Sequence, residues 1–258
     1  NPLTTFQTNV MGTANILEAI RICESVKTIV AITTDKCYEN IEKDYAYVET
    51  DSLGGYDPYS SSKACAEHVA SAYYRSFFKE KNIGLATARA GNVIGGGDWS
   101  VDRLIPDMIK SWSKNKKLVI RYPLATRPWQ HVLEPLSGYI ALAECLWGNP
   151  VEFSGGWNFG PDQNSVKTVE DTVDLAMQVW GNSAEWGTSS ENYLHEANLL
   201  QLNSDKANAL LGWRPTFNFD EAVNKTISWY KKYYSENQEI MNFSMGQIND
   251  YESRNINV

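Results

Sequence analysis

Short apolar runs rich in β-branched residues alternate with longer amphipathic segments along this chain. The apolar runs predict buried β-strands over residues 26–33, 84–89, 118–121 and 156–160. The amphipathic segments predict helices over residues 10–23, 57–78, 102–112, 132–147, 169–179, 204–211 and 219–234. Because neighbouring parallel strands need a crossover that is usually a helix, this alternation favours an α/β fold with a parallel sheet.

The chain opens with a helix rather than with the strand that usually begins a doubly wound sheet. In nucleotide-binding sheets of that kind, a Gly-rich turn between the first strand and its helix receives the pyrophosphate. The sequence has no GxGxxG, and its glycine run at 95–97 does not follow an opening strand. We therefore expect the first strand–helix units to be missing, ~90 residues by the size of a βαβ unit.

The composition is that of a globular protein with one large domain or slightly more. The chain has 258 residues, of which 43% are hydrophobic and 21% charged. A net charge of −8 argues against binding nucleic acid, whereas a small phosphorylated ligand needs only one or two well-placed cations. No apolar run approaches about 18 residues, so neither a membrane span nor a signal peptide is expected.

The cysteines and histidines are scattered. Four cysteines and three histidines occur, without a CxxC pair or another spacing typical of a metal site. A disulfide framework is not expected at this chain length. The sequence thus predicts free thiols in a reducing cytoplasm and no bound metal.

A tyrosine and a lysine four residues apart stand at the start of the helix predicted over residues 57–78. Asp57 suits the N-cap of this helix, and Pro58 suits its first position. Tyr59 and Lys63 share one helix face, and a cation beside a phenol favours the phenolate. Tyr59 is therefore a candidate general base near neutral pH. Since the same spacing recurs by chance on exposed helices, the pair needs a second motif to support it.

A polar segment ends the buried strand predicted over residues 26–33. It consists of Thr33, Thr34, Asp35 and Lys36. The carboxyl ends of parallel strands are where ligands bind in open α/β sheets. A hydroxyl, a carboxylate and an amine in sequence offer a hydrogen-bond donor, an acid and a base. The alternative is a polar strand end that only caps a loop.

Together the two motifs resemble the active site of the extended short-chain dehydrogenase/reductase superfamily, which has a Ser or Thr at the strand end and Tyr-x-x-x-Lys on the next helix. Thr34, Tyr59 and Lys63 match these positions. The nucleotide-sugar 4,6-dehydratases of the superfamily place an acid/base pair directly after the Thr, and here the pair is Asp35 and Lys36. Three longer segments are similar to the pattern of CDP-glucose 4,6-dehydratases, namely TDKCY at 34–38, RAGNVIGGGDW at 89–99 and TRPWQHVLEPL at 126–136.

The resemblance runs from residue 9 to about residue 234 and implies a fold. That fold is a Rossmann-like doubly wound parallel sheet, lacking its first strand–helix units, with a smaller mixed α/β C-terminal region that binds the substrate. Residues 1–92 would be the C-terminal half of the NAD-binding domain and carry the catalytic residues. Residues 93–236 would mostly bind the nucleotide sugar, with about 127–147 returning to the Rossmann core. Residues 237–258 would be a polar tail, to which the sequence assigns no element.

The resemblance also implies a reaction, the NAD-dependent conversion of CDP-glucose to CDP-4-keto-6-deoxyglucose and water in deoxysugar and O-antigen biosynthesis. Tyr59, assisted by Lys63 and Thr34, would take the proton of the hydroxyl on sugar carbon 4 while a hydride goes to the nicotinamide. Lys36 would remove the proton on carbon 5, and Asp35 would protonate the hydroxyl that leaves carbon 6. To act as a base, Lys36 needs a pKa well below about 10.4, or else it stabilises an enolate as a cation.

The binding residues follow from the same resemblance. Those implied for the cofactor NAD are Thr33, Tyr59, Lys63 and Ala90. Those implied for the nucleotide sugar are Asn92, Arg103, Leu104, Arg127 and His131. A planar guanidinium matches phosphate oxygens, so both arginines are candidate phosphate clamps, with a surface salt bridge as the alternative for each. His131 is expected to order the loop around Arg127.

Three alternatives stay open at this point. The chain could be another nucleotide-sugar enzyme, such as a 4-epimerase or a decarboxylase. It could be a binding protein that keeps the fold without turnover, or an inactive fragment. Family members usually dimerise through two helices that include the one with the Tyr-x-x-x-Lys motif, so a homodimer or homotetramer is expected, without a membrane or nucleic-acid partner.

Overall fold

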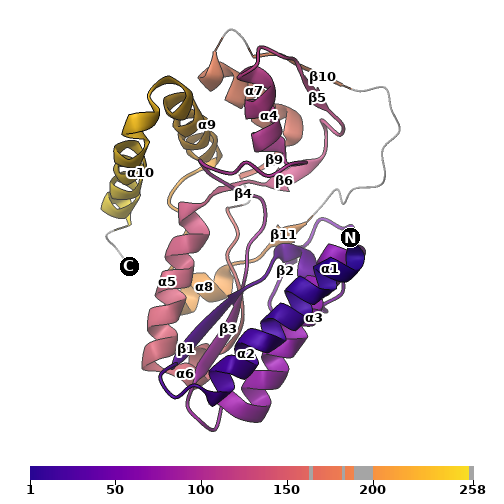
Figure 1. The fold of residues 1–258 in the computed structure, drawn as a ribbon, viewed down its shortest axis with the longest axis vertical. Helices are drawn as coiled ribbons and strands as arrows, with labels where there is room; N and C mark the ends of the chain where they lie inside the picture. The colour runs from indigo at the N-terminus through magenta and orange to yellow at the C-terminus, as the bar shows by residue number, and fades with distance from the viewer. Residues whose placement is uncertain (163–164, 182–183, 189–199, 256–258) are drawn as a thin grey trace. The chain divides into compact units, whose positions relative to one another are not determined.

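The protein, in a computed structural model, is described over residues 1–162, 165–181, 184–188 and 200–255, which form two compact units (Figure 1). The first unit comprises Asn1–Gly91, Pro135–Gly160 and Leu200–Arg214. The second unit comprises Asn92–Glu134, Pro161–Leu199 and Pro215–Val258. The domain boundaries expected from the sequence stay a prediction.

A three-stranded parallel sheet forms the centre of the first unit (Figure 1). Its strands stand in the order β1 (Thr28–Ile32), β3 (Gly84–Arg89) and β8 (Gly155–Asn158). Every residue of β3 is buried, because this strand lies between the other two and is covered on both faces. The α/β fold with a parallel sheet, predicted from the alternation of strands and helices, is confirmed.

Helices cover both faces of this sheet. The covering helices are α2 (Gly12–Ile22), α3 (Pro58–Tyr73) and α5 (Leu133–Gly148). On one face Leu85 of β3 packs with Leu17 and Ala70, which come from α2 and α3. On the other face Ala86 of β3 packs with Leu142 of α5. Successive strand side chains point to opposite faces, so the continuous apolar run of β3 supplies two cores at once.

The shorter elements of the first unit complete its chain path. They are α1 (Pro2–Phe6), η1 (Gln7–Met11), η2 (Asp35–Cys37), β2 (Ala46–Tyr47), η3 (Tyr74–Phe78), α6 (Pro150–Phe153), β11 (Gln201–Leu202) and α8 (Asp205–Leu211). The first helix therefore begins eight residues earlier than the sequence predicted, because α1 and η1 lead directly into α2. Strands β2 and β11 pair in parallel, apart from the central sheet.

The start of α3 is as the sequence predicted. Asp57 is the N-cap, and its Oδ1 accepts hydrogen bonds from Tyr59 N at 2.8 Å and Ser60 N at 3.1 Å. Pro58 occupies the first helical position, where a missing N–H costs nothing. This cap fixes the turn that carries Tyr59.

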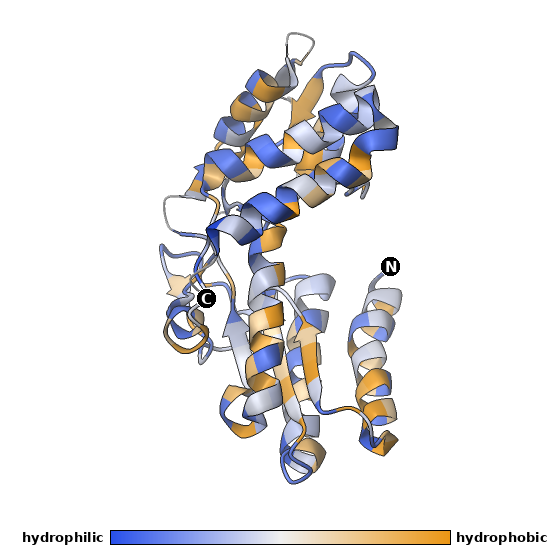
Figure 2. Ribbon diagram, turned by 90° about the vertical axis from the view of Figure 1, so that its left-hand side faces the viewer, coloured by the Kyte–Doolittle hydropathy of each residue, from blue (hydrophilic) through white to orange (hydrophobic). Residues whose placement is uncertain are grey.

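The second unit combines short strand pairs with three amphipathic helices that share one core. Its elements are β4 (Val93–Ile94), α4 (Leu104–Trp112), β5 (Leu118–Ile120), β6 (Thr126–Pro128), β7 (Gln130–His131), β9 (Val166–Thr168), α7 (Val169–Trp180), β10 (Trp186–Thr188), α9 (Phe219–Ser235), η5 (Asn237–Glu239) and α10 (Ile240–Arg254). Helices α4, α7 and α9 contribute Met108, Trp112, Val173, Ile227 and Tyr230, all fully or almost fully buried. Figure 2 shows that most helices carry both hydrophobic and hydrophilic residues, as expected when one face packs on a core.

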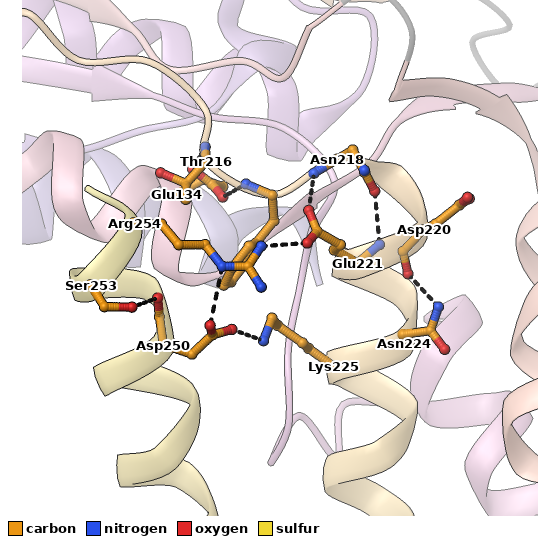
Figure 3. Close-up of polar contacts among 11 residues, drawn as sticks. Glu134, Thr216, Asn218, Asp220, Glu221, Asn224, Lys225, Asp250, Ser253 and Arg254 are labelled. Carbon is orange, nitrogen blue, oxygen red and sulfur yellow. Dashed lines mark hydrogen bonds and ion pairs between the residues drawn. The ribbon is translucent and has the colours of Figure 1, made fainter. Parts of the chain in front are cut away.

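The C-terminal segment, to which the sequence assigned no element, forms η5 and α10. Ion pairs connect α10 to α9 (Figure 3). Arg254 pairs with Glu221 at 2.5 Å and with Asp250 at 3.1 Å, and Asp250 also pairs with Lys225. The pairs with Glu221 and Lys225 join residues far apart in the sequence, so a search for apolar periodicity could not find this helix.

The glycine run at 95–97 is explained by packing inside the second unit. A Cβ on Gly95 would lie 2.6 Å from Val132, and one on Gly96 would lie 2.1 Å from the ring of Trp229. Gly97 has a φ of +85°, which L side chains rarely adopt. Each of the three positions therefore favours glycine. In the part of the chain that the structure describes, no helix is long and apolar enough to cross a membrane.

Candidate active site at the carboxyl end of the sheet

The backbone fixes the candidate catalytic residues at the carboxyl ends of β1 and β3. The ladder between these strands continues past their ends, because Asp35 N donates to Ala90 O at 3.2 Å. Thr34 is the N-cap of η2, and its Oγ1 accepts from Lys36 N at 3.3 Å. Thr34 and Asp35 thus lie at the end of β1, as predicted, and Ala90, which directly follows β3, lies beside them.

The carboxylate of Asp35 is buried against Gly91. Asp35 is 3% exposed, and Thr34 Oγ1 donates to its Oδ1 at 3.0 Å. A Cβ at Gly91 would lie 1.9 Å from Asp35 Oδ2, so a larger residue here would displace the carboxylate. Gly91 is therefore part of the candidate site, although no sequence pattern singles it out.

Helix α3 presents Tyr59 and Lys63 from its first two turns. Lys63 Nζ donates to the carbonyl of Ile32, the last residue of β1, at 3.3 Å. Its ammonium therefore points to the same strand end that carries Thr34. Burial lowers the pKa of Lys63, and the charge of Glu67 opposes that effect. Tyr59 is 44% exposed to solvent.

Lys36 is exposed and lies close to the start of α3. Burial raises the pKa of Asp57, but hydrogen bonds from Ser60 and Tyr59 together with the charge of Lys36 lower it overall. Lys36 thus lies on the surface of the described part of the first unit, near the carboxylate of Asp57.

A buried polar network, which the sequence analysis missed, lies at the same ends of the strands. Glu67 of α3 accepts hydrogen bonds from Thr33, Thr87 and Arg89. Arg89 also donates to the hydroxyl of Tyr38 at 2.6 Å. Two signals in the sequence could have indicated this network. Glu67 stands in a stretch of α3 that consists mostly of small residues, and Arg89 ends the apolar run of β3.

The residues predicted to bind the nucleotide sugar lie in the second unit. Asn92 has a φ of 46°, and its carbonyl accepts from Gln130 N at 3.3 Å, which joins the neighbouring strands β4 and β7. Arg103 precedes α4, which Leu104 begins, and it pairs with Asp98 at 3.1 Å.

Arg127 lies on β6 of the same unit and donates to the carbonyl of Thr126 at 2.8 Å. Its strand pairs antiparallel with β9, opposite Lys167. The two arginines predicted to bind the diphosphate thus both lie in this unit. Within the described ranges, no three His, Cys, Asp or Glu side chains are grouped as a metal site would require.

His131 is a buried neutral imidazole rather than a surface ligand. Its Nδ1 accepts from Leu133 N at 3.4 Å, and among the described residues its buried Nε2 has no partner. Its ring packs edge-on against Phe217. Burial, with a contribution from the nearby charge of Lys225, lowers the pKa of His131 to about 4.

This histidine is expected to make the stability of the protein depend on pH. In the unfolded chain His131 binds a proton below pH 6.5, whereas in the folded protein it stays neutral down to about pH 4. The unfolded state therefore binds more protons in this window, so stability is complete above pH 6.5 and falls by about 2–4 kcal/mol as the pH drops to 4. Urea unfolding of wild type and His131→Gln across this range measures the difference in slope.

The exposed His68 of α3 gives a matched control, since its side chain is solvated in both states. His68→Gln should keep the wild-type slope. An unchanged slope in His131→Gln would contradict the prediction.

The geometry of the first unit agrees with the comparison to known proteins. The family model for GDP-mannose 4,6 dehydratase matches residues 1–226. The chain belongs to this family. It is 48% identical to the CDP-glucose 4,6-dehydratase of Salmonella typhimurium over 257 residues, which cover 98% of this chain and 71% of that protein. The relationship to nucleotide-sugar dehydratases predicted from the motifs is confirmed.

More distant relatives match this chain at lower identity. Human dTDP-D-glucose 4,6-dehydratase is 25% identical over 87% of this chain, which spans 62% of the human protein. The structure of dTDP-glucose 4,6-dehydratase from Bacillus anthracis in complex with NAD matches 92% of this chain and 71% of its own, with a TM-score of 0.75 and 26% identity. UDP-glucuronic acid 4-epimerase from Bacillus cereus, at 22% identity and a TM-score of 0.75 over 88% of this chain and 69% of its own, shares the fold.

Proposed function

We propose that the protein catalyses the NAD-dependent 4,6-dehydration of CDP-glucose to CDP-4-keto-6-deoxyglucose and water. One observation carries the proposal: Thr34 and the buried Asp35 lie at the strand end to which the Lys63 ammonium of α3 points. This arrangement supports a redox pair, Tyr59 and Lys63, and an elimination pair, Asp35 and Lys36, on adjacent elements. The choice of the cytosine nucleotide is supported by the 48% identity to a CDP-glucose 4,6-dehydratase.

The strand end fits a nicotinamide dinucleotide. Lys63 has three N–H groups, and Ile32 O is the one acceptor that the described residues give it, so further N–H groups remain for hydroxyls of a ribose. When bound, NAD⁺ would accept a hydride from the sugar and later return it, so that the sugar undergoes no net oxidation. Tyr59 and Lys63 would bind it from α3, and Ala90 would do so from the end of β3. Thr33 would contribute its backbone, since its hydroxyl donates to Glu67.

The side chains of this unit then divide the proton transfers between them. Tyr59 accepts the proton of the hydroxyl on sugar carbon 4, with Lys63 stabilising the phenolate and Thr34 bonding to the same hydroxyl. The resulting ketone makes the proton on carbon 5 acidic. Lys36 is the candidate to remove that proton, and Asp35 protonates the hydroxyl that leaves carbon 6, so that a double bond forms between carbons 5 and 6 and water departs.

The second unit would hold the nucleotide sugar. Arg103 and Arg127 are assigned to the diphosphate, because a planar guanidinium matches phosphate oxygens. Asn92 is assigned to a sugar or phosphate oxygen, and Leu104 to an apolar contact beside it. His131, neutral and buried, is assigned to ordering the strand end that precedes α5.

Replacing Lys36 by Met is expected to separate oxidation from elimination. Whether Lys36 removes the carbon-5 proton or stabilises the enolate as a cation, its loss should lower the elimination rate by about 10²–10⁴-fold. Reduced nicotinamide should still form at nearly the wild-type rate in a single turnover. Lys43→Met, at an exposed position seven residues further along the chain, is the matched control. Elimination by Lys36→Met at the wild-type rate would refute the assignment.

A product assay tests the function itself. The full-length protein is incubated with NAD⁺ and either CDP-glucose or UDP-glucose, and the products are identified by mass spectrometry and NMR. A 4-keto-6-deoxy sugar from CDP-glucose is expected. A C4 epimer from UDP-glucose, carbon dioxide from UDP-glucuronate, or tight NAD⁺ binding without turnover would instead point to an epimerase, a decarboxylase or a binding protein.

The same proposal includes a cytoplasmic homodimer or homotetramer. Helix α2 exposes Ile16 and Ile22, apolar side chains that an interface between copies of the chain would cover. Sedimentation velocity measures the mass of the assembly, and a monomer would contradict this part of the proposal.

A further inference from the structure

Glu67, one turn of α3 after Lys63, forms a buried ion pair with Arg89 of β3. Glu67 and Arg89 are each 4% exposed. Arg89 Nε donates to Glu67 Oε1 at 2.9 Å, and its Nη2 donates to Oε2 at 2.8 Å. This two-pronged contact is the strongest form of a carboxylate–guanidinium pair. The charges therefore compensate each other inside the first unit.

The surroundings of Glu67 require a carboxylate. Thr33 Oγ1 donates to Oε1 at 2.5 Å, and Thr87 Oγ1 donates to Oε2 at 2.6 Å. With Arg89, each carboxylate oxygen accepts two hydrogen bonds from donors. An amide in this position would turn an NH₂ group toward donors. Glutamine is therefore a poor substitute even though its shape is the same.

The contacts of the pair lead to the elements that carry the candidate catalytic residues. Thr33 directly precedes Thr34 at the end of β1. Arg89 ends β3 and donates to Tyr38, whose hydroxyl donates to Asn158 of β8 at 2.8 Å. One network thus ties α3 to the ends of all three strands of the sheet. A pair needed only for stability would not have to lie at this end.

We propose that Glu67 is a positioning residue for Lys63: with Arg89 it holds α3 against the ends of β1 and β3, and it places a carboxylate one turn of α3 after the half-buried Lys63 ammonium. The role of Lys63 beside Tyr59 rests on the proposed function. The effect of Glu67 on Lys63 does not depend on the identity of the sugar.

Charge is the second way in which Glu67 acts on Lys63. Burial lowers the pKa of Lys63 from 10.5, and Glu67 raises it again. The other groups near Lys63 are the thiol of Cys37 on η2 and the carbonyl of Ile32 on β1, and Tyr59 stands one turn earlier on α3. Burial raises the pKa of Cys37 to about 12, so its thiol carries no charge at neutral pH. Glu67 is thus the anionic group among them, with Arg89 acting through it.

A double variant, Glu67→Gln with Arg89→Met, tests the proposal without leaving an unpaired buried charge. The pKa of Lys63 is measured from the pH dependence of its acylation by acetic anhydride, followed by mass spectrometry. We expect the pKa of Lys63 to fall by about one unit, since an opposite charge at close range shifts a pKa by about 1–3 units. The alkaline limb of the kcat/KM profile with CDP-glucose should move to lower pH by the same amount. An unchanged pKa of Lys63 would overturn the proposal.

Controls separate this role from stability alone and from the proposed function. Thr87→Val removes one hydrogen bond to Glu67 but no charge, so it should lower stability and leave both limbs of the pH profile in place. If the double variant does not fold, Glu67→Gln alone should shift the pKa of Lys63 further in the same direction, because Arg89 then stays unpaired. If wild type does not convert CDP-glucose, the proposed function fails, while the acylation experiment still decides the role of Glu67.

Discussion

Replacing Tyr59 by Phe is expected to lower kcat by about 10²–10⁴-fold with CDP-glucose, the range usual for the loss of a general acid or base. The substitution removes only the phenolic hydroxyl. The N-cap contact stays, because Asp57 accepts from the backbone N–H of Tyr59. Since the residue is 44% exposed, the free energy of unfolding should change by about 0.5 kcal/mol or less. A single-turnover measurement of reduced nicotinamide reports the affected step directly.

Tyr56 offers a matched control three residues earlier. It is 96% exposed and precedes the helix cap, so Tyr56→Phe removes the same atom from a side chain outside the proposed site. Its rate should equal that of wild type. If Tyr59→Phe forms reduced nicotinamide as fast as wild type does, the first proton transfer belongs to another residue.

The elements that carry these residues could be predicted because their signals are local. Strand β3 has the bounds expected from its continuous apolar run, and α3 begins where Asp57 and Pro58 predicted it. Thr34 and Asp35 follow the apolar run of β1, so their place at the carboxyl end of the sheet also follows from neighbouring residues. Their chemical roles stay predictions.

The rest of the site depends on contacts between distant parts of the chain. Nothing near Gly91 indicates that the carboxylate of Asp35 occupies the place of its missing side chain. Likewise, Glu67 and Arg89 come from a helix and a strand whose register the sequence does not specify. Helix α10 is a third case, because its ion pairs with α9 replace the apolar stripe by which a helix is usually recognised. Local sequence patterns therefore do not reveal which charged groups and which side-chain volumes complement one another across distant parts of the chain.

Replacing Glu134, whose carboxylate lies at the start of α5, is expected to cause the largest loss of stability in the second unit. Glu134 is fully buried and accepts from Thr216 N at 2.9 Å (Figure 3). It also accepts from Phe217 N at 2.8 Å and from the Tyr251 hydroxyl at 2.9 Å. Glu134→Ala leaves these donors buried without that acceptor, and each such group costs about 1–3 kcal/mol. We expect the free energy of unfolding to fall by about 3–5 kcal/mol in urea.

Amide hydrogen exchange localises this effect, because the protection of Thr216 and Phe217 depends directly on Glu134. Both amides should exchange faster in Glu134→Ala. Tyr251→Phe removes one of the three bonds, from α10 alone, and should cost about 1 kcal/mol. Glu144→Ala, at an exposed position of the same helix, should change stability by about 0.5 kcal/mol or less. If Glu134→Ala matches this control and both amides stay protected, another acceptor satisfies these groups, and Glu134 does not hold the segment before α9 to the start of α5.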